Sequence, residues 1–301
     1  MHSTPLSANP VVDFGIDRGS IRFIGEGLQR PECILAEPDG TIWSADARGG
    51  VVRISPDSTQ QIIAQQPSEH FHEAHSESSR YLQGTLPNGL AFARNGDFLI
   101  SNFGTDRLER MTRDGRSKVL ADQIDGLPIG KVNFVLRDSK DRIWITVSTR
   151  VTNWMHALRT DLADGFIARY DDGVFRVVAD GFRFTNEIRF DASEQFLYVV
   201  ETTGGCITRL RIDDRGNVSG REIFGPTTLG KGAWPDGIAF DTYGNLWGTL
   251  VYSDKLFVLT PQGDMRVLLD EGDPEHVADL ERAFNASSVT EDVLFRTGRG
   301  I

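Results

Sequence analysis

The chain has 301 residues, of which 39% are hydrophobic and 25% charged, and its formal net charge at pH 7 is -11. This composition is typical of a soluble globular protein, and the length suits one large all-β domain. The acidic balance argues against nucleic acid and against an anionic membrane surface as partners.

The N-terminal segment carries no targeting signal that we recognise. Residues 1–13 are polar and lack the apolar stretch of a signal peptide, and no apolar run in the chain approaches the length of a membrane span. We expect residues 1–13 to form a flexible leader and residues 14–301 to form a single domain. The segment Ser20–Ile24 predicts a short strand that closes the fold by joining its last sheet.

Five stretches of the chain then follow one pattern. Each begins with a polar residue, which we call the head residue; a turn follows eight residues later and a large apolar residue eleven residues later. The head residues are Glu32, Asn88, Asn133, Asn186 and Asp236, and the apolar residues are Trp43, Leu99, Trp144, Leu197 and Trp247. A repeat of roughly 50 residues built from short strands predicts the blades of a β-propeller, which must stack on one another to bury their faces.

Two insertions and a helix interrupt this pattern. The stretch 66–84 contains His70, His72 and His75 and is interpreted first as an exposed loop with incidental histidines. The alternatives are a metal site or a loop that folds over the site described below and supplies His75 as a substrate-contacting residue. The stretch 150–165 contains Trp154, which either lines a pocket wall or plugs the space between blades. Asp273–Phe284 predicts a helix, and the remainder contains no further copy of the pattern, so either the chain is shortened or its last blade is incomplete.

The head residues carry the functional prediction. Each is expected to begin the first strand of its blade, and the first strands of a propeller surround the central axis, so the five side chains should converge. Two carboxylates and three amides, with no Lys or Arg to neutralise them, form an oxygen-rich set that suits a hard divalent cation. One such residue alone often only caps a turn, but capping does not require the same offset in every copy.

The head residues and the segments 88–92 and 235–247 resemble the senescence marker protein (regucalcin) and gluconolactonase family, over roughly residues 20–265. The resemblance implies an all-β, six-bladed β-propeller with a metal at the mouth of its central tunnel. The residues that match the family's metal ligands are Glu32, Asn186 and Asp236, with Asn133 beside them. Calcium is the metal that we expect first, with zinc, manganese, magnesium and iron(II) as alternatives.

The resemblance also implies a reaction, the metal-dependent hydrolysis of a lactone or related carboxylic ester. Asp236 is expected to act as general base, with Glu32 as the second candidate. Asn88 and Asn133 are expected to orient the small-molecule substrate. Lys131 stands where the family's sugar lactonases often carry a substrate-binding arginine, and this difference argues for a bulkier or more apolar lactone than an aldonolactone.

Two other functions use the same set of residues. One is a phosphotriesterase of the diisopropyl fluorophosphatase type, and the other is a non-catalytic, calcium-binding propeller. The two cysteines, Cys33 and Cys206, fall in different copies and are expected to be free thiols, which fits a cytoplasmic location. No Gly-x-Ser-x-Gly sequence is present, so a serine hydrolase of that type is not expected.

Overall fold

The computed structural model describes residues 9–66, 84–171 and 173–294. These residues form five four-stranded antiparallel sheets, in each of which the strands pair in chain order. We call the sheets blades 1 to 5. Blade 1 contains β1 (Glu32–Ala36), β2 (Ile42–Ala45), β3 (Gly50–Ile54) and β4 (Gln60–Ala64); blade 2 contains β5 (Pro87–Phe92), β6 (Phe98–Asn102), β7 (Arg107–Met111) and β8 (Ser117–Ala121); blade 3 contains β11 (Val132–Arg137), β12 (Ile143–Val147), β13 (Gly165–Asp171) and β14 (Val174–Phe182); blade 4 contains β15 (Thr185–Phe190), β16 (Phe196–Glu201), β17 (Cys206–Ile212) and β18 (Val218–Phe224); blade 5 contains β19 (Trp234–Phe240), β20 (Leu246–Val251), β21 (Lys255–Leu259) and β22 (Met265–Asp270).

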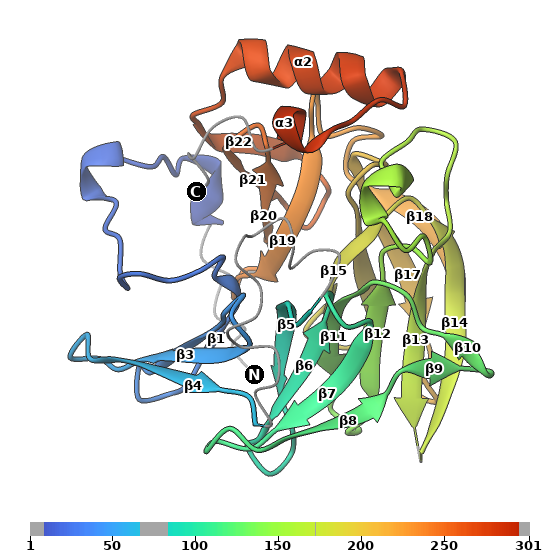
Figure 1. Ribbon diagram of the computed structural model, residues 1–301. Coiled ribbons are helices and arrows are strands. Elements are labelled where there is room, and N and C mark those ends of the chain that lie inside the picture. Colours follow the sequence, from blue (N-terminus) through green and yellow to red (C-terminus); the bar gives the residue numbers. More distant parts are fainter. Residues whose placement is uncertain (1–8, 67–83, 172, 295–301) are drawn as a thin grey trace, which may run out of the picture.

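The blades follow one another around a central axis (Figure 1). Their first strands are innermost, and β1, β5, β11, β15 and β19 each lie beside the next. A short hairpin, β9 (Gln123–Ile124) and β10 (Leu127–Pro128), connects blades 2 and 3. The all-β propeller is confirmed, whereas the six-blade count is not, because blade 5 leads into two helices within the described residues.

The core consists mainly of apolar layers between neighbouring blades. Trp43 of blade 1 stacks on Phe98 of blade 2 with ring centroids 4.8 Å apart, and Trp144 of blade 3 meets an aromatic ring of blade 4 at 5.4 Å. Further apolar clusters join blades 2 and 3 and blades 4 and 5. Each blade therefore buries its faces against the next, as expected of a stacked repeat.

The three tryptophans of the repeat are tied to an acidic residue in the preceding turn. Trp144 Nε1 donates to Asp138 Oδ2 (2.9 Å), and the equivalent bonds join Trp43 to Glu37 and Trp247 to Asp241. Each acid lies five residues after its head residue, so the turn is locked to the second strand. In blade 3 the acid is fully enclosed and also accepts from Arg142 Nε at 2.6 Å.

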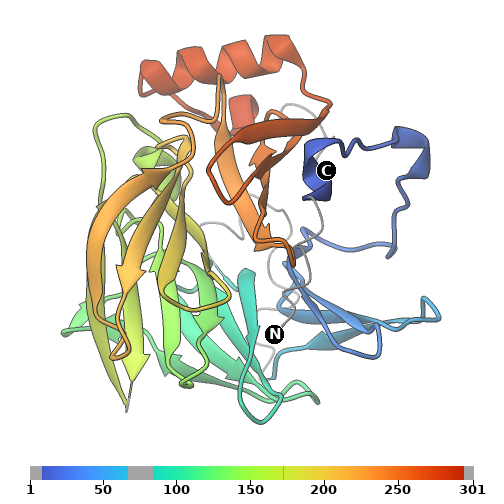
Figure 2. The ribbon, with the colours of Figure 1, turned by 180° about the vertical axis from the view of Figure 1, so that it is seen from behind.

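Residues 9–31 run from blade 5 to blade 1 (Figures 1 and 2). They contain two single-turn 3-10 helices, η1 (Pro10–Val12) and η2 (Arg18–Ser20). Asn9 exchanges hydrogen bonds with Asn245 of blade 5, and Gln29 O accepts from Ala47 N of blade 1 at 2.9 Å. The strand predicted over Ser20–Ile24 was wrong: Ser20 ends η2 and residues 21–24 form no strand, while the contacts with blade 5 come from earlier residues, such as Phe14 on Trp247. Residues 9–13 of the predicted leader are part of this connection.

Helix α2 (Pro274–Asn285) confirms the predicted C-terminal helix, and the short helix α3 (Glu291–Leu294) follows it. The Asp273 carboxylate caps α2 by accepting from Glu275 N at 2.8 Å, and Pro274 occupies the first turn. Phe284 of α2 packs on Trp234 of blade 5 at 5.3 Å between ring centroids. None of the helices in the described part of the chain is both long and apolar enough to cross a membrane.

We predict that Asp138→Asn lowers the free energy of unfolding by about 3 kcal/mol, because it removes the charge that pairs with the buried Arg142. Urea denaturation followed by tryptophan fluorescence measures this. The matched control is Asp161→Asn, which breaks an exposed ion pair with Arg159 and should leave the midpoint unchanged. Equal midpoints for wild type and Asp138→Asn would contradict the prediction.

Candidate functional site

The head residues lie where the sequence predicted them, at the start of the innermost strand of each blade. We call this end of the innermost strands the mouth. In every blade the pairing between the first and second strands shifts register at or directly after the head residue. Such bulges bend a strand and redirect a side chain. Because all five blades have one at this position, the bulges are a regular feature of the mouth.

Neighbouring head residues contact one another. Asn88 Nδ2 donates to the main-chain oxygen of Asn133 at 2.9 Å, across blades 2 and 3. Asn186 Nδ2 donates to Asp236 Oδ1, across blades 4 and 5. The three asparagines are buried, whereas both carboxylates are partly accessible. The structure therefore brings the predicted metal-binding residues to one end of the innermost strands.

Arg30 also belongs to the mouth, which corrects the expectation that no cation lies among the head residues. Its Nη2 lies 3.0 Å from Glu32 Oε1, and its Nη1 donates to Asn88 Oδ1 at 2.8 Å. The guanidinium thus joins the head residues of blades 1 and 2. Its positive charge also acts on Asp236 of blade 5.

Asp236 is held in an environment that disfavours its charge. Burial raises the pKa of its carboxyl above the ordinary value, while the charge of Arg30 and the hydrogen bond from Asn186 oppose this rise. A raised pKa makes the Asp236 carboxylate a stronger proton acceptor than an exposed aspartate.

A hydroxyl behind the mouth fixes the Asn186 amide. Thr202 Oγ1 accepts from Asn186 Nδ2 at 3.1 Å and donates to Pro235 O at 2.9 Å, so it links blade 4 to the residue before Asp236. Ser101 has a similar place in blade 2, where its hydroxyl donates to Asn133 O at 2.6 Å. The hydroxyls of Thr202 and Ser101 therefore hold the main chain at or next to the head residues Asp236 and Asn133.

A charged pair follows the head residue Asn186 in the innermost strand of blade 4. Glu187, which follows Asn186, accepts from Ile238 N at 3.0 Å and pairs with Arg189 at 3.0 Å. Burial raises the pKa of Glu187, and the Arg189 charge opposes the rise. Cys33 lies close to this pair, and burial raises the pKa of its thiol to about 12, so it is a poor nucleophile at neutral pH. Cys33 and Cys206 are free, as predicted.

A buried apolar cluster, which we call the rim, lies at the same end of the blades as the mouth. The rim draws residues from all five blades and from both C-terminal helices: Ala47, Leu86, Phe103, Trp154, Ala157, Leu158, Phe184, Trp234, Leu280 and Leu294. Three of these residues stand two positions before a head residue, namely Leu86, Phe184 and Trp234.

The remaining predicted substrate residues have other partners or lie outside the described residues. Lys131 is only 2% exposed, and its Nζ lies 2.9 Å from Asp106 Oδ1. Trp154 lies in η3 (Trp154–Ala157) and packs between Phe103 and Phe184, with ring centroids 6.1 and 6.0 Å away. This agrees with the plug between blades rather than with an open pocket wall. His75 lies outside the described residues.

The donor set fits a divalent cation by its chemistry. Carboxylate and amide oxygens are the ligands that calcium, magnesium and manganese prefer. In the described part of the chain, no group of three or more His, Cys, Asp and Glu side chains is arranged to hold a metal. A site here would therefore need the asparagine oxygens beside the carboxylates of Glu32 and Asp236.

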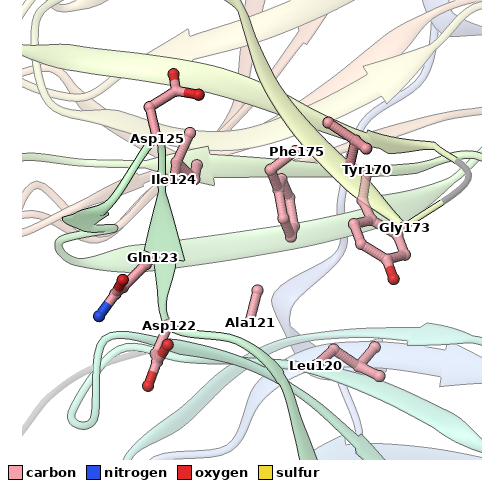
Figure 3. A pocket seen from close by; sticks show the side chains of 10 residues that line it. Leu120, Ala121, Asp122, Gln123, Ile124, Asp125, Tyr170, Gly173 and Phe175 are labelled. Atoms are coloured by element: carbon pink, nitrogen blue, oxygen red, sulfur yellow. The ribbon is translucent and has the colours of Figure 1, made fainter.

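A separate pocket of about 370 Å³ lies on the outer side of blades 2 and 3 (Figure 3). Its lining includes Phe175 of blade 3 and Ile124 of the β9–β10 hairpin, whose side chains lie side by side in Figure 3. None of the head residues lines this pocket, which lies on the outermost strands of blades 2 and 3.

Arg30, Thr202 and Glu187 were missed from the sequence. Arg30 stands two positions before Glu32, just as Lys131 stands two positions before Asn133, so comparison of that position in all five copies would have found it. Glu187 directly follows the head residue Asn186, and comparison of that position between the copies would have drawn attention to its charge. Thr202 follows β16 and has no regular place in the repeat that the sequence pattern could reveal.

Comparison with protein families gives one match over most of the chain. A family model described as SMP-30/Gluconolactonase/LRE-like region matches residues 31–271. The adipocyte plasma membrane-associated protein of Danio rerio is 26% identical over 244 residues, which cover 76% of this chain and 55% of that protein. The chain thus spans about half the length of this curated relative.

Solved structures with the same fold include a gluconolactonase and a calcium-binding protein. The gluconolactonase XC5397 of Xanthomonas campestris superposes with a TM-score of 0.62 at 21% identity, covering 81% of this chain and 76% of that one. The calcium-binding protein regucalcin of Agrobacterium tumefaciens has a TM-score of 0.62 at 18% identity, covering 82% and 75%. At these identities the likeness supports the propeller fold.

We predict that Thr202→Val weakens divalent-cation binding about tenfold, because it frees the Asn186 amide from its support. Calorimetric titration with calcium or manganese measures the affinity. Thr203→Val is the matched control, since the Thr203 hydroxyl is buried without a hydrogen-bond partner among the described residues. Equal affinities of the two variants would refute a supporting role for Thr202.

Proposed function

Because the chain belongs to the SMP-30/gluconolactonase/LRE-like family, we propose that it is a divalent-metal-dependent lactonase. The family supports a lactonase-type function in general. The observation that carries the proposal is the gathering of Glu32, Asn88, Asn133, Asn186 and Asp236 at one end of the innermost strands. The free cysteines are in keeping with a cytoplasmic protein.

Glu32, Asn186 and Asp236 would hold the cation, with Asn133 alongside. Calcium is the proposed metal, with zinc, manganese, magnesium and iron(II) as alternatives; regucalcin of A. tumefaciens, which shares the fold, is described as calcium-binding. When bound there, a divalent cation would act as a Lewis acid on the ester carbonyl and lower the pKa of a nearby water.

Asp236 is the general base of this proposal. Its raised pKa suits it to take a proton from the attacking water, at the carboxylate oxygen that does not hold the cation. Water adds to the carbonyl carbon, the ring C–O bond breaks, and Asp236 returns the proton to the departing ring oxygen. Glu32 is less suited to this role because its carboxylate is engaged by Arg30.

The surroundings of the mouth favour an apolar lactone over a polyhydroxylated one. The rim places apolar side chains at the same end of the blades as the head residues, and Lys131 pairs with Asp106. Asn88 and Asn133 are the polar groups beside the carboxylates that would orient the lactone ring.

We expect Glu32→Gln and Asp236→Asn to lower lactone hydrolysis by at least a hundredfold while the far-ultraviolet circular dichroism stays unchanged, since each variant removes a ligand or base and keeps the side-chain shape. Glu26→Gln, on the exposed segment before blade 1, is the matched control and should keep full activity. Near-normal hydrolysis by either mouth variant would overturn the proposal.

The substrate and the metal are tested with one panel. Metal-stripped protein is assayed with each cation added back, against gluconolactone, xylonolactone, an apolar γ-lactone and a phosphotriester. We expect metal-dependent hydrolysis with the highest kcat/KM for the apolar γ-lactone. Turnover of the phosphotriester alone would move the assignment to a phosphotriesterase, and tight metal binding without any hydrolysis would indicate a calcium-binding propeller.

A further inference from the structure

The mouth contains its own counter-charge. Arg30 pairs with Glu32 at 3.0 Å, and its charge also acts on Asp236. Lys131 is engaged by Asp106. Among the described residues, Arg30 is thus a cation that acts on both carboxylates of the mouth.

The guanidinium is placed as a bridging cation. It contacts the carboxylate of Glu32 at 3.0 Å and the amide oxygen of Asn88 at 2.8 Å, and both are oxygen donors of the kind that a hard metal would use. The Arg30 side chain is 21% exposed, so the pair is shielded from water on most sides. A planar guanidinium with several N–H groups can satisfy such oxygens without a metal.

The backbone at Arg30 is unusual as well. Its φ of 45° lies in the left-handed region, which residues with a Cβ seldom adopt, and the following Pro31 restricts Arg30 further. The contacts of Arg30 therefore hold it in a conformation that its own preferences disfavour. This indicates a specific place for the side chain rather than a freely moving surface arginine.

From these observations we infer that Arg30 competes with the divalent cation for Glu32. The guanidinium and a metal ion are two positive charges that draw on the same carboxylate, so the Arg30–Glu32 ion pair opposes metal ligation by Glu32. Arg30 consequently stabilises the metal-free protein and weakens its metal affinity. The inference rests on the metal site of the proposed function, and it makes Arg30 a determinant of how tightly that site binds.

The test uses calorimetric titration of the metal-stripped protein with calcium and, separately, manganese. Arg30→Gln removes the charge and should bind the cation on the order of tenfold to a hundredfold more tightly than wild type, because a like charge is removed from the site. Arg30→Lys keeps the charge and should remain close to wild type. In thermal melts, metal-free Arg30→Gln should unfold at a lower temperature than wild type, and added metal should raise its midpoint more.

Arg48→Gln is the matched control. Arg48 is also 21% exposed and pairs with a carboxylate of blade 1, Asp46, at 2.7 Å. This variant should lower the melting temperature without tightening metal binding. It separates a general loss of an ion pair from the competition inferred for Arg30.

The outcomes distinguish this inference from the proposed function. If Arg30→Gln binds the cation no more tightly than wild type, the competition is refuted while the metal site stands. If neither protein binds a divalent cation, the metal site itself fails and the competition fails with it. Tighter binding by Arg30→Gln, but not by Arg48→Gln, supports the competition whether or not any lactone is hydrolysed.

Discussion

The packing of each blade against the next is the interaction on which the rest of the structure depends. A four-stranded sheet of this kind has two faces, and contacts such as Trp43 on Phe98 bury them only when the neighbouring blade is present. Because the stacked sheets keep their first strands side by side around the axis, residues about 50 positions apart in the sequence meet at one end of those strands. The polar mouth and the apolar rim are both products of that arrangement.

The repeat explains how much of the fold could be predicted. Head residues and the large apolar residues eleven positions later kept one register, so the first two strands of each blade were found from the sequence, and the Asp-Pro start of α2 marked the helix. The path of residues 9–31 could not be found in the same way. It depends on side-chain contacts such as Asn9 with Asn245, which are 236 residues apart and leave no periodic signal.

At the candidate site the residue types were predictable and their partners were not. Their shared position in the repeat indicated that Asn186 and Asp236 would lie at the same end of adjacent strands, and they do contact each other. Arg30 escaped notice because only the head position was compared between copies, and its side chain reaches back to Asn88 in the next blade. The bulges at the head residues also depend on pairing between strands, which a single sequence does not display.

Arg30 and Glu32 belong to blade 1, whereas Asp236 belongs to blade 5, the last sheet in the described chain. The connection between these two blades is the segment 9–31, so the charges of the mouth face each other across the place where the beginning and the end of the repeat meet. The charge of Arg30 on Asp236 therefore acts between the first and the last sheets of the repeat, in addition to the connection that residues 9–31 make.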